Sequence, residues 1–184
     1  MRVFVALEVP DRDVLDSLVS FQRELVATGA DLKPVEKENL HFTVKFLGEI
    51  SEAQAREAGE RLKKLRLARA TVDLQGVGAF PNASRPGVVW AGVPRSHEPR
   101  VVPIAEEAIN ALHGIGEEDN RPFTPHVTLA RVRSERRRPE LVALLRSNAE
   151  RRFGEVTLTE MRLKSSVLGP RGPTYTDVGV YPLT

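Results

Sequence analysis

Hydrophobic residues recur with two different periods along the chain, and together these periods predict an α+β fold. Short apolar runs typical of strands cover residues 3–7 and 40–47. Apolar side chains spaced three and four residues apart predict helices after Asp11 and after Ser51, two residues that favour helix starts. With another strand near residues 71–77, the first part of the chain reads strand, helix, strand, helix, strand.

The same order of elements returns in the second part of the chain. The predicted strands and helices cover residues 88–93, 102–112, 125–132, 140–148, 156–168 and 174–181. Between the two parts, residues 80–86 are rich in Pro, Asn and Ser and predict a linker. We therefore expect a single bilobal domain over residues 1–184, built from sequence repeats at approximately 1–79 and 87–184.

Composition excludes several classes of protein. The chain has 184 residues, is 41% hydrophobic and 28% charged, and contains no cysteine. It therefore lacks disulfides and thiol nucleophiles, and no apolar run approaches the roughly 18 residues of a membrane span. The first strand is followed at once by acidic Glu8 and Asp11, unlike a signal peptide. We expect a cytoplasmic protein with no membrane partner.

The charge of the chain is balanced overall but uneven locally. The formal net charge is +2, which is too small to hold nucleic acid by a general field. Arginine outnumbers lysine, 21 to 6, and forms one dense cluster: Arg131, Arg133, Arg136, Arg137 and Arg138. Arginine suits phosphate contacts, but such clusters also occur at helix starts and on solvated faces, so both interpretations stand.

Two His-x-Thr motifs are the strongest chemical signal. His41 lies 38 residues after Val3 (41 − 3), and His126 lies 38 residues after Val88 (126 − 88). Side chains alternate along a strand, so the His and the Thr of each motif share one face. A duplicated unit would bring both motifs to equivalent places, facing across one cleft.

Two imidazoles in one site favour general acid and base catalysis on a phosphodiester. One ring can be neutral and the other protonated near neutral pH. The hydroxyls of Thr43 and Thr128 can donate hydrogen bonds to the phosphate oxygens. A two-histidine metal site is the competing interpretation, but neither motif contains a carboxylate ligand, and we expect no metal and no cofactor. His97 and His113 have no counterpart in the repeat and are predicted to be structural or surface residues.

These motifs resemble those of the 2H phosphoesterase superfamily, and within it the RNA 2′,3′-cyclic phosphodiesterases historically called 2′-5′ RNA ligases. The similar segments cover most of the chain: residues 2–7, 39–49, 122–131 and 166–175. The resemblance implies two pseudo-symmetric lobes around a central cleft, each with a mainly antiparallel sheet and two helices. It also implies a metal-independent reaction that opens a 2′,3′-cyclic phosphate to a 2′-phosphate.

The resemblance implies a role for each site residue. His41 protonates the leaving 3′ oxygen, His126 activates water, and Thr43 and Thr128 hold the phosphate. Arg131 corresponds to an arginine that contacts the phosphate and the base.

Phe46 corresponds to a residue that stacks on the nucleobase. Phe46 and Arg131 each lie five residues after a catalytic histidine, an odd number that points them to the opposite face of an unbroken strand. Their roles therefore require a bulge, a bend or the end of the strand.

Three functions remain open. The leading hypothesis is hydrolysis of the 2′,3′-cyclic phosphates of RNA or nucleotides. The expected partner is then RNA with a 2′,3′-cyclic phosphate end or a small cyclic nucleotide. The alternatives are 2′-5′ RNA ligation, which is the reverse chemistry, and binding of phosphorylated RNA ends without turnover. We expect the protein to act as a monomer.

Overall fold

A computed structural model describes the whole chain, residues 1–184. Its strands are β1 (Arg2–Glu8), β2 (Leu32–Pro34), β3 (His41–Glu49), β4 (Ala70–Gln75), β5 (Val77–Asn82), β6 (Arg85–Gly92), β7 (His126–Val132), β8 (Arg152–Leu158), β9 (Glu160–Gly169) and β10 (Gly172–Pro182). Its α-helices are α1 (Arg12–Ala27), α2 (Glu52–Lys63), α3 (Glu98–Ala111) and α4 (Arg138–Ser147). Short 3₁₀ turns precede β3 and α3.

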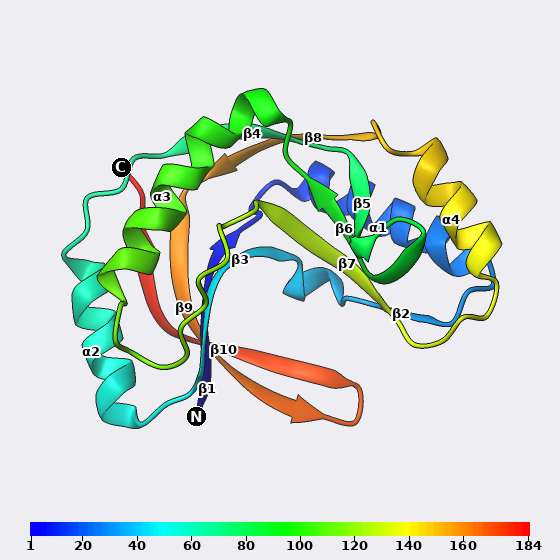
Figure 1. Cartoon of the computed structure of the whole chain (residues 1–184). Coiled ribbons are helices and arrows are strands. Elements are labelled where there is room, and N and C mark those ends of the chain that lie inside the picture. The colour runs from blue at the N-terminus through cyan, green and yellow to red at the C-terminus, as the bar shows by residue number, and fades with distance from the viewer.

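The eight-stranded main sheet is divided into two lobes by a narrow joint. The strand order is β10-β9-β1-β3-β7-β6-β5, with β2 added beside β7, and every pairing is antiparallel. Between β3 and β7 only Phe42 and Val127 pair, so the two lobes diverge from this point. One lobe holds β1, β3, β9 and β10, and the other holds β2, β5, β6 and β7 (Figure 1).

Two helices pack against strands of the other sequence repeat. Helix α1 comes from the first repeat but packs against β7 and β8, whereas α3 comes from the second repeat and packs against β3 and β4. Helix α2 contacts β10, and α4 contacts β5 and β6, so each lobe has two helices. A two-stranded sheet of β4 and β8 runs along the top of both lobes (Figure 1). The expected α+β architecture is confirmed.

The buried side chains form one cluster of 43 residues that runs through both lobes. The two lobes therefore share a core instead of folding around separate ones. No helix combines the length and the apolar character that a bilayer span requires.

Two sequence predictions about elements are wrong, and one short strand was not predicted. Residues 80–86 are not a linker but the end of a hairpin between β5 and β6, because the Asn82 side chain accepts the backbone N–H groups of Ser84 and Arg85 at 3.0 Å each and closes a turn. The predicted strand 156–168 is two strands in different sheets, β8 and β9. Strand β2 was not predicted, because a strand of three residues is too short to show an alternation of apolar and polar side chains.

The predicted helix ends are close to those observed. The Ser51 hydroxyl accepts the N–H of Gln54, and the Gln54 side chain accepts the N–H of Ser51, which closes a capping box at the start of α2. Asp11 precedes α1 but its carboxylate accepts the N–H of Thr157 at 3.2 Å, so it ties the helix start to β8 instead of capping it.

Candidate active site

The two His-x-Thr motifs meet at the joint between the lobes. Phe42 pairs with Val127, so continuing this antiparallel register by one residue places Thr43 beside His126 and His41 beside Thr128. Phe42 and Val127 are fully buried in the core, while the histidines and threonines are partly exposed on the other side. The four side chains therefore form one array on this side of the sheet, which we call the open face.

A β-bulge in β7 brings Arg131 onto the open face. Trp90 pairs with Thr128 and Val88 pairs with Arg131, so β7 has one more residue than β6 in this interval. Because Trp90 and Val88 share a face, Thr128 and Arg131 share it too, despite the odd spacing. The guanidinium of Arg131 is exposed and makes no ion pair or hydrogen bond within the protein.

A matching bulge in β3 brings Phe46 onto the same face. Ala6 pairs with Thr43 and Phe4 pairs with Phe46, with one extra residue in β3 between them. The Phe46 side chain is 61% exposed, and its ring centroid lies 6.1 Å from that of Phe4. Phe46 and Arg131 therefore occupy equivalent places in the two lobes.

Each histidine lies against aromatic rings of its own lobe. His41 stacks on Phe4 with 5.2 Å between ring centroids, and Tyr175 meets His41 edge-on at 5.7 Å. In the other lobe, Phe80 meets His126 edge-on at 5.0 Å, and Trp90 lies 6.4 Å away. No motif predicted a role for these four aromatic residues, because they lie far from both histidines along the chain.

The hydrogen bonds of the two histidines differ. His126 Nδ1 lies 2.7 Å from the carbonyl oxygen of Thr124, which can only accept, so Nδ1 carries a proton. In the neutral ring this leaves the lone pair on Nε2. His41 Nε2 lies 3.0 Å from the hydroxyl oxygen of Thr43. The neutral ring of His126 is thus held in the tautomer that can act as a base through Nε2.

Burial favours the uncharged form of both rings. It lowers the pKa of His41 from the ordinary value of 6.5 to about 4, with Lys164 contributing in the same direction and the Asn39 backbone opposing. Burial also lowers the pKa of His126, against a smaller opposing effect of the Thr124 carbonyl. These directions run against the expectation that one ring is protonated near neutral pH in the unliganded site, because partial burial withdraws both rings from much of the surrounding water.

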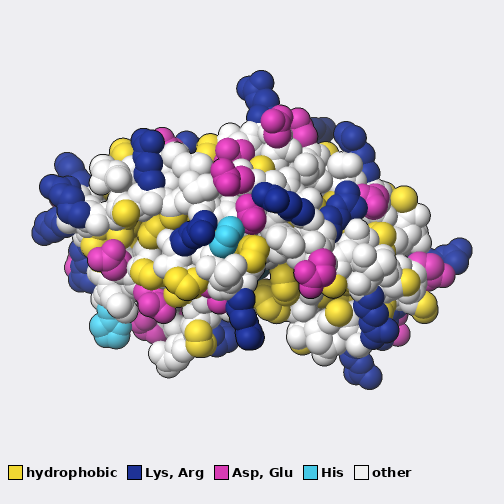
Figure 2. Space-filling view, turned by 90° about the horizontal axis from the view of Figure 1, so that it is seen from above, with side chains coloured by type: hydrophobic (Ala, Val, Ile, Leu, Met, Phe, Trp, Pro, Cys, Tyr) yellow, Lys and Arg dark blue, Asp and Glu magenta, His cyan; other side chains and the backbone are white.

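The rest of the arginine cluster is engaged in ion pairs and hydrogen bonds around the start of α4. Arg133 pairs with Asp31 at 3.1 Å, and Arg136 donates to the carbonyl of Gly29 at 3.0 Å. Arg137 and Arg138 pair with acidic residues three positions away. In the view of Figure 2, basic side chains are interspersed with acidic ones and form no continuous stripe. Within the cluster, Arg131 is the residue left available for a ligand.

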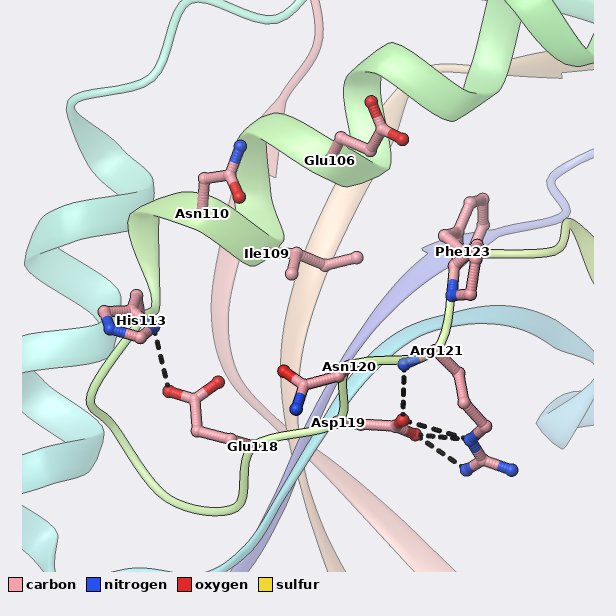
Figure 3. A pocket seen from close by; sticks show the side chains of 10 residues that line it. Glu106, Ile109, Asn110, His113, Glu118, Asp119, Asn120, Arg121 and Phe123 are labelled. Carbon is pink, nitrogen blue, oxygen red and sulfur yellow. Dashed lines mark hydrogen bonds and ion pairs between the residues drawn. The ribbon is translucent and has the colours of Figure 1, made fainter.

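A separate pocket of about 320 Å³ lies between the end of α3 and the loop that leads to β7 (Figure 3). His113 pairs there with Glu118 at 3.3 Å, and Arg121 pairs with Asp119 at 2.7 Å. Four of the charged or titratable groups are thus paired with one another, and neither motif histidine lines this pocket. It is therefore separate from the array on the open face.

The two remaining histidines lie outside the array. His97 Nδ1 accepts the backbone N–H of Asp73 at 2.9 Å, a contact that ties the turn before α3 to β4. The His113 side chain is 83% exposed. No group of three or more His, Asp or Glu side chains has the arrangement of a metal site.

The chain is similar to a described family and to curated proteins over most of its length. The family model LigT like Phosphoesterase matches it twice, over residues 9–90 and 92–175. The RNA 2′,3′-cyclic phosphodiesterase of Aeropyrum pernix is 42% identical over 86% of this chain and 90% of its own length. The protein of the same name from Archaeoglobus fulgidus is 36% identical over 98% and 99%.

Solved structures share the whole fold. The crystal structure of TT0787 from Thermus thermophilus is 32% identical, with a TM-score of 0.76 over 100% of this chain and 98% of that one. The structure of Escherichia coli LigT complexed with 3′-AMP is 25% identical, with a TM-score of 0.81 and the same coverage.

Proposed function

The chain belongs to the LigT-like phosphoesterase family, and from this premise we propose that it hydrolyses the 2′,3′-cyclic phosphate of RNA ends or small nucleotides to a 2′-phosphate. The observation that carries the proposal is the array of two imidazoles and two hydroxyls on one face at the joint of the lobes. Three functional groups must meet a single phosphorus atom: a base for water, an acid for the departing oxygen, and donors for the phosphate oxygens.

In the proposed reaction the two histidines move protons in opposite directions. His126 Nε2 takes a proton from water as the water oxygen bonds to phosphorus, and the P–O3′ bond breaks as His41 gives a proton to O3′. The Thr124 contact supports the base role, because it leaves the Nε2 lone pair of His126 free. His41 requires a proton to act as the acid, and the anionic phosphate supplies the charge that favours its protonated form.

The other site residues hold the substrate in the proposal. Thr43 and Thr128 donate hydrogen bonds to the non-bridging oxygens, where negative charge gathers in the transition state. Arg131 contacts the phosphate with a guanidinium that has no partner within the protein, and Phe46 offers an exposed ring to the nucleobase. The protein acts as a monomer and uses no metal in this proposal.

The proposal is tested with an oligonucleotide that ends in a 2′,3′-cyclic phosphate, incubated with enzyme in excess chelator. We expect a 2′-phosphate product and a loss of at least about 10²-fold in kcat for His41→Ala and for His126→Ala. His113→Ala is the matched control, because this histidine is exposed and outside the array. A 3′-phosphate product, or full activity in either variant, contradicts the proposal, and tight binding without turnover indicates a binding module.

A further inference from the structure

A buried ion pair lies on the open face beside His41, and the proposed reaction does not use it. The carboxylate of Glu8 and the ammonium of Lys164 are 2.7 Å apart, with side-chain exposures of 18% and 8%. Withdrawing two charges from water costs several kcal/mol per ion, and their attraction often only offsets this cost. Stability alone is therefore weak grounds for placing such a pair here.

The strand register brings the pair next to the ring of His41. Glu8 pairs with His41 across β1 and β3, so the two side chains leave neighbouring strands on the same face. Lys164 pairs with Phe4 across β1 and β9, and Phe4 is the ring on which His41 stacks.

Between Glu8 and Phe4 on this face of β1 lies only Ala6, which is fully buried. The side chain of Ala6 ends at Cβ, so it leaves space above it. Lys164 must cross this space to reach Glu8, and His41 must lean over it to stack on Phe4. The imidazole and the ammonium group therefore converge above Ala6.

Other charged groups lie on this face of the two outer strands, and Arg162 of β9 pairs with Ala6 itself. Asp177 of β10 lies 3.7 Å from Lys164 and 3.0 Å from Arg162, and Arg162 also binds Glu160 at 2.7 Å. Tyr175 contacts His41 through its ring, and His126 faces it from β7. The charge that acts on His41 from β9 is the Lys164 ammonium, which lowers the pKa of that ring in addition to burial.

We propose that Lys164, held in place by Glu8, is a positioning residue that adds to the effect of burial in keeping His41 uncharged until the phosphate of the substrate reaches the other side of the ring. His41 then takes up a proton from solvent as the anion binds, so the acid becomes charged only in the complex. This inference rests on the proposed acid role of His41, but its electrostatic part is measurable without turnover.

The test follows the protonation of His41 by NMR titration of the histidine ring carbons in the unliganded protein, with the His41 signal assigned from its absence in His41→Ala. In Lys164→Met we expect the His41 midpoint to rise by about one pH unit, because a like charge is lost and Glu8 is left unpaired. In Lys164→Arg, which keeps the charge, we expect the midpoint to stay within about 0.3 units of wild type.

Arg162→Met is the matched control, since it removes a cation of the same strand that pairs with Glu160 and Asp177 and does not contribute to the pKa shift of His41. It should leave the His41 midpoint unchanged. If Lys164→Met does not fold, the double variant Glu8→Gln with Lys164→Met removes both buried charges together and is expected to raise the midpoint as well. An unchanged midpoint in the folded variant, or an equal rise in Arg162→Met, overturns the inference.

Measurements of turnover distinguish a failure of this inference from a failure of the proposed function. With a 2′,3′-cyclic nucleotide, the kcat/KM optimum of Lys164→Met should move to higher pH, and Lys164→Arg should restore the wild-type profile. If the wild-type protein hydrolyses no cyclic phosphate, the proposed function fails while the NMR result still decides the role of Lys164. If hydrolysis is observed but the optimum of Lys164→Met does not move, the inference about Lys164 fails alone.

Discussion

At the scale of single residues, the two motif histidines have the same neighbours in sequence but different chemistry in space. Each is followed by a buried apolar residue and a threonine, yet Nδ1 of His126 binds a backbone carbonyl while Nε2 of His41 contacts Thr43. The ring environments also differ, because Lys164 acts on His41. The surroundings of the two rings therefore differ in ways that no motif reveals.

The pKa directions predict the pH dependence of the enzyme. In the proposed mechanism the free enzyme needs His126 without its proton as the base and His41 with a proton as the acid, and burial lowers the pKa of both below 6.5. Activity expressed as kcat/KM therefore falls at low pH as His126 is protonated and falls at high pH as His41 is deprotonated, with its optimum below pH 6.5. A bound phosphate anion favours both charged rings, so the optimum of kcat lies at higher pH. Coincident optima above pH 7 contradict the two pKa directions.

Phe46 tests the proposed contact with the nucleobase. Its side chain is 61% exposed and so adds little to stability, while stacking of one base on an aromatic ring is worth about 1–3 kcal/mol. We expect Phe46→Ala to raise KM for a cyclic nucleotide by about tenfold with little change in kcat or thermal midpoint. Phe46→Trp keeps a stacking surface and should keep KM near wild type, and an unchanged KM in Phe46→Ala removes this residue from the site.

At the scale of secondary-structure elements, the two bulges determine that Phe46 and Arg131 lie on the open face. Without them, the odd spacing from each histidine would turn Phe46 and Arg131 into the core. The register also shows that Phe4, and not Val3, is the counterpart of Val88, because these two residues pair with Phe46 and Arg131. The equivalent spacings to the histidines are therefore 37 and 38 residues (41 − 4 and 126 − 88), not equal as the sequence suggested.

Gln22 of α1 holds the bulge in β7. It is 5% exposed, and its Nε2 donates to the carbonyl oxygens of Val35 and Leu129 at 2.8 Å each, Leu129 being the extra residue of the bulge. We expect Gln22→Met to lower the free energy of unfolding by about 1–3 kcal/mol, because the carbonyls of Val35 and Leu129 each lose a hydrogen bond, although Leu129 keeps the N–H of Val35. We also expect the substitution to reduce kcat/KM, because the bulge that positions Arg131 loses the hydrogen bond from Gln22.

Arg23→Met, on the exposed side of the same helix, is the control for Gln22→Met and should change neither quantity. Denaturant unfolding and steady-state kinetics measure both effects. Wild-type kinetics in a destabilised Gln22→Met would show that the bulge keeps its shape without this side chain.

At the scale of the whole molecule, the sequence repeats and the structural lobes are different units. Helix α1 leaves its own repeat to cover β7 and β8, α3 leaves its own to cover β3 and β4, and β9 and β10 extend the lobe that β1 begins. The exchange keeps one core continuous through both lobes. The strands that carry the two histidines are therefore each packed against a helix of the other repeat.

This exchange predicts how a divided chain behaves. Cleavage between Ala83 and Ser84, at the exposed end of the β5–β6 hairpin, separates the repeats without removing a core residue. We expect neither fragment to fold alone, because each exposes the helix and strands that the other covers, and we expect the mixed fragments to regain structure and activity. Circular dichroism of each fragment and of the mixture measures this, and a folded single fragment would contradict the shared core.

The sequence by itself predicted the helices, most of the strands, the capping box of α2, the α+β architecture and the two His-x-Thr motifs, because these follow from local periods of two and 3.6 residues and from a motif that occurs twice. Only the tertiary structure decided what depends on contacts between distant residues: the hairpin at residues 80–86, the exchange of helices, the bulges under Phe46 and Arg131, and the ion pair of Glu8 with Lys164. Strand register and burial are set by neighbours across the sheet, which a one-dimensional pattern does not specify. The types of residue at the candidate site could therefore be identified from the sequence. The charges and burial around the two histidines depend on contacts that form only when the two repeats pack together.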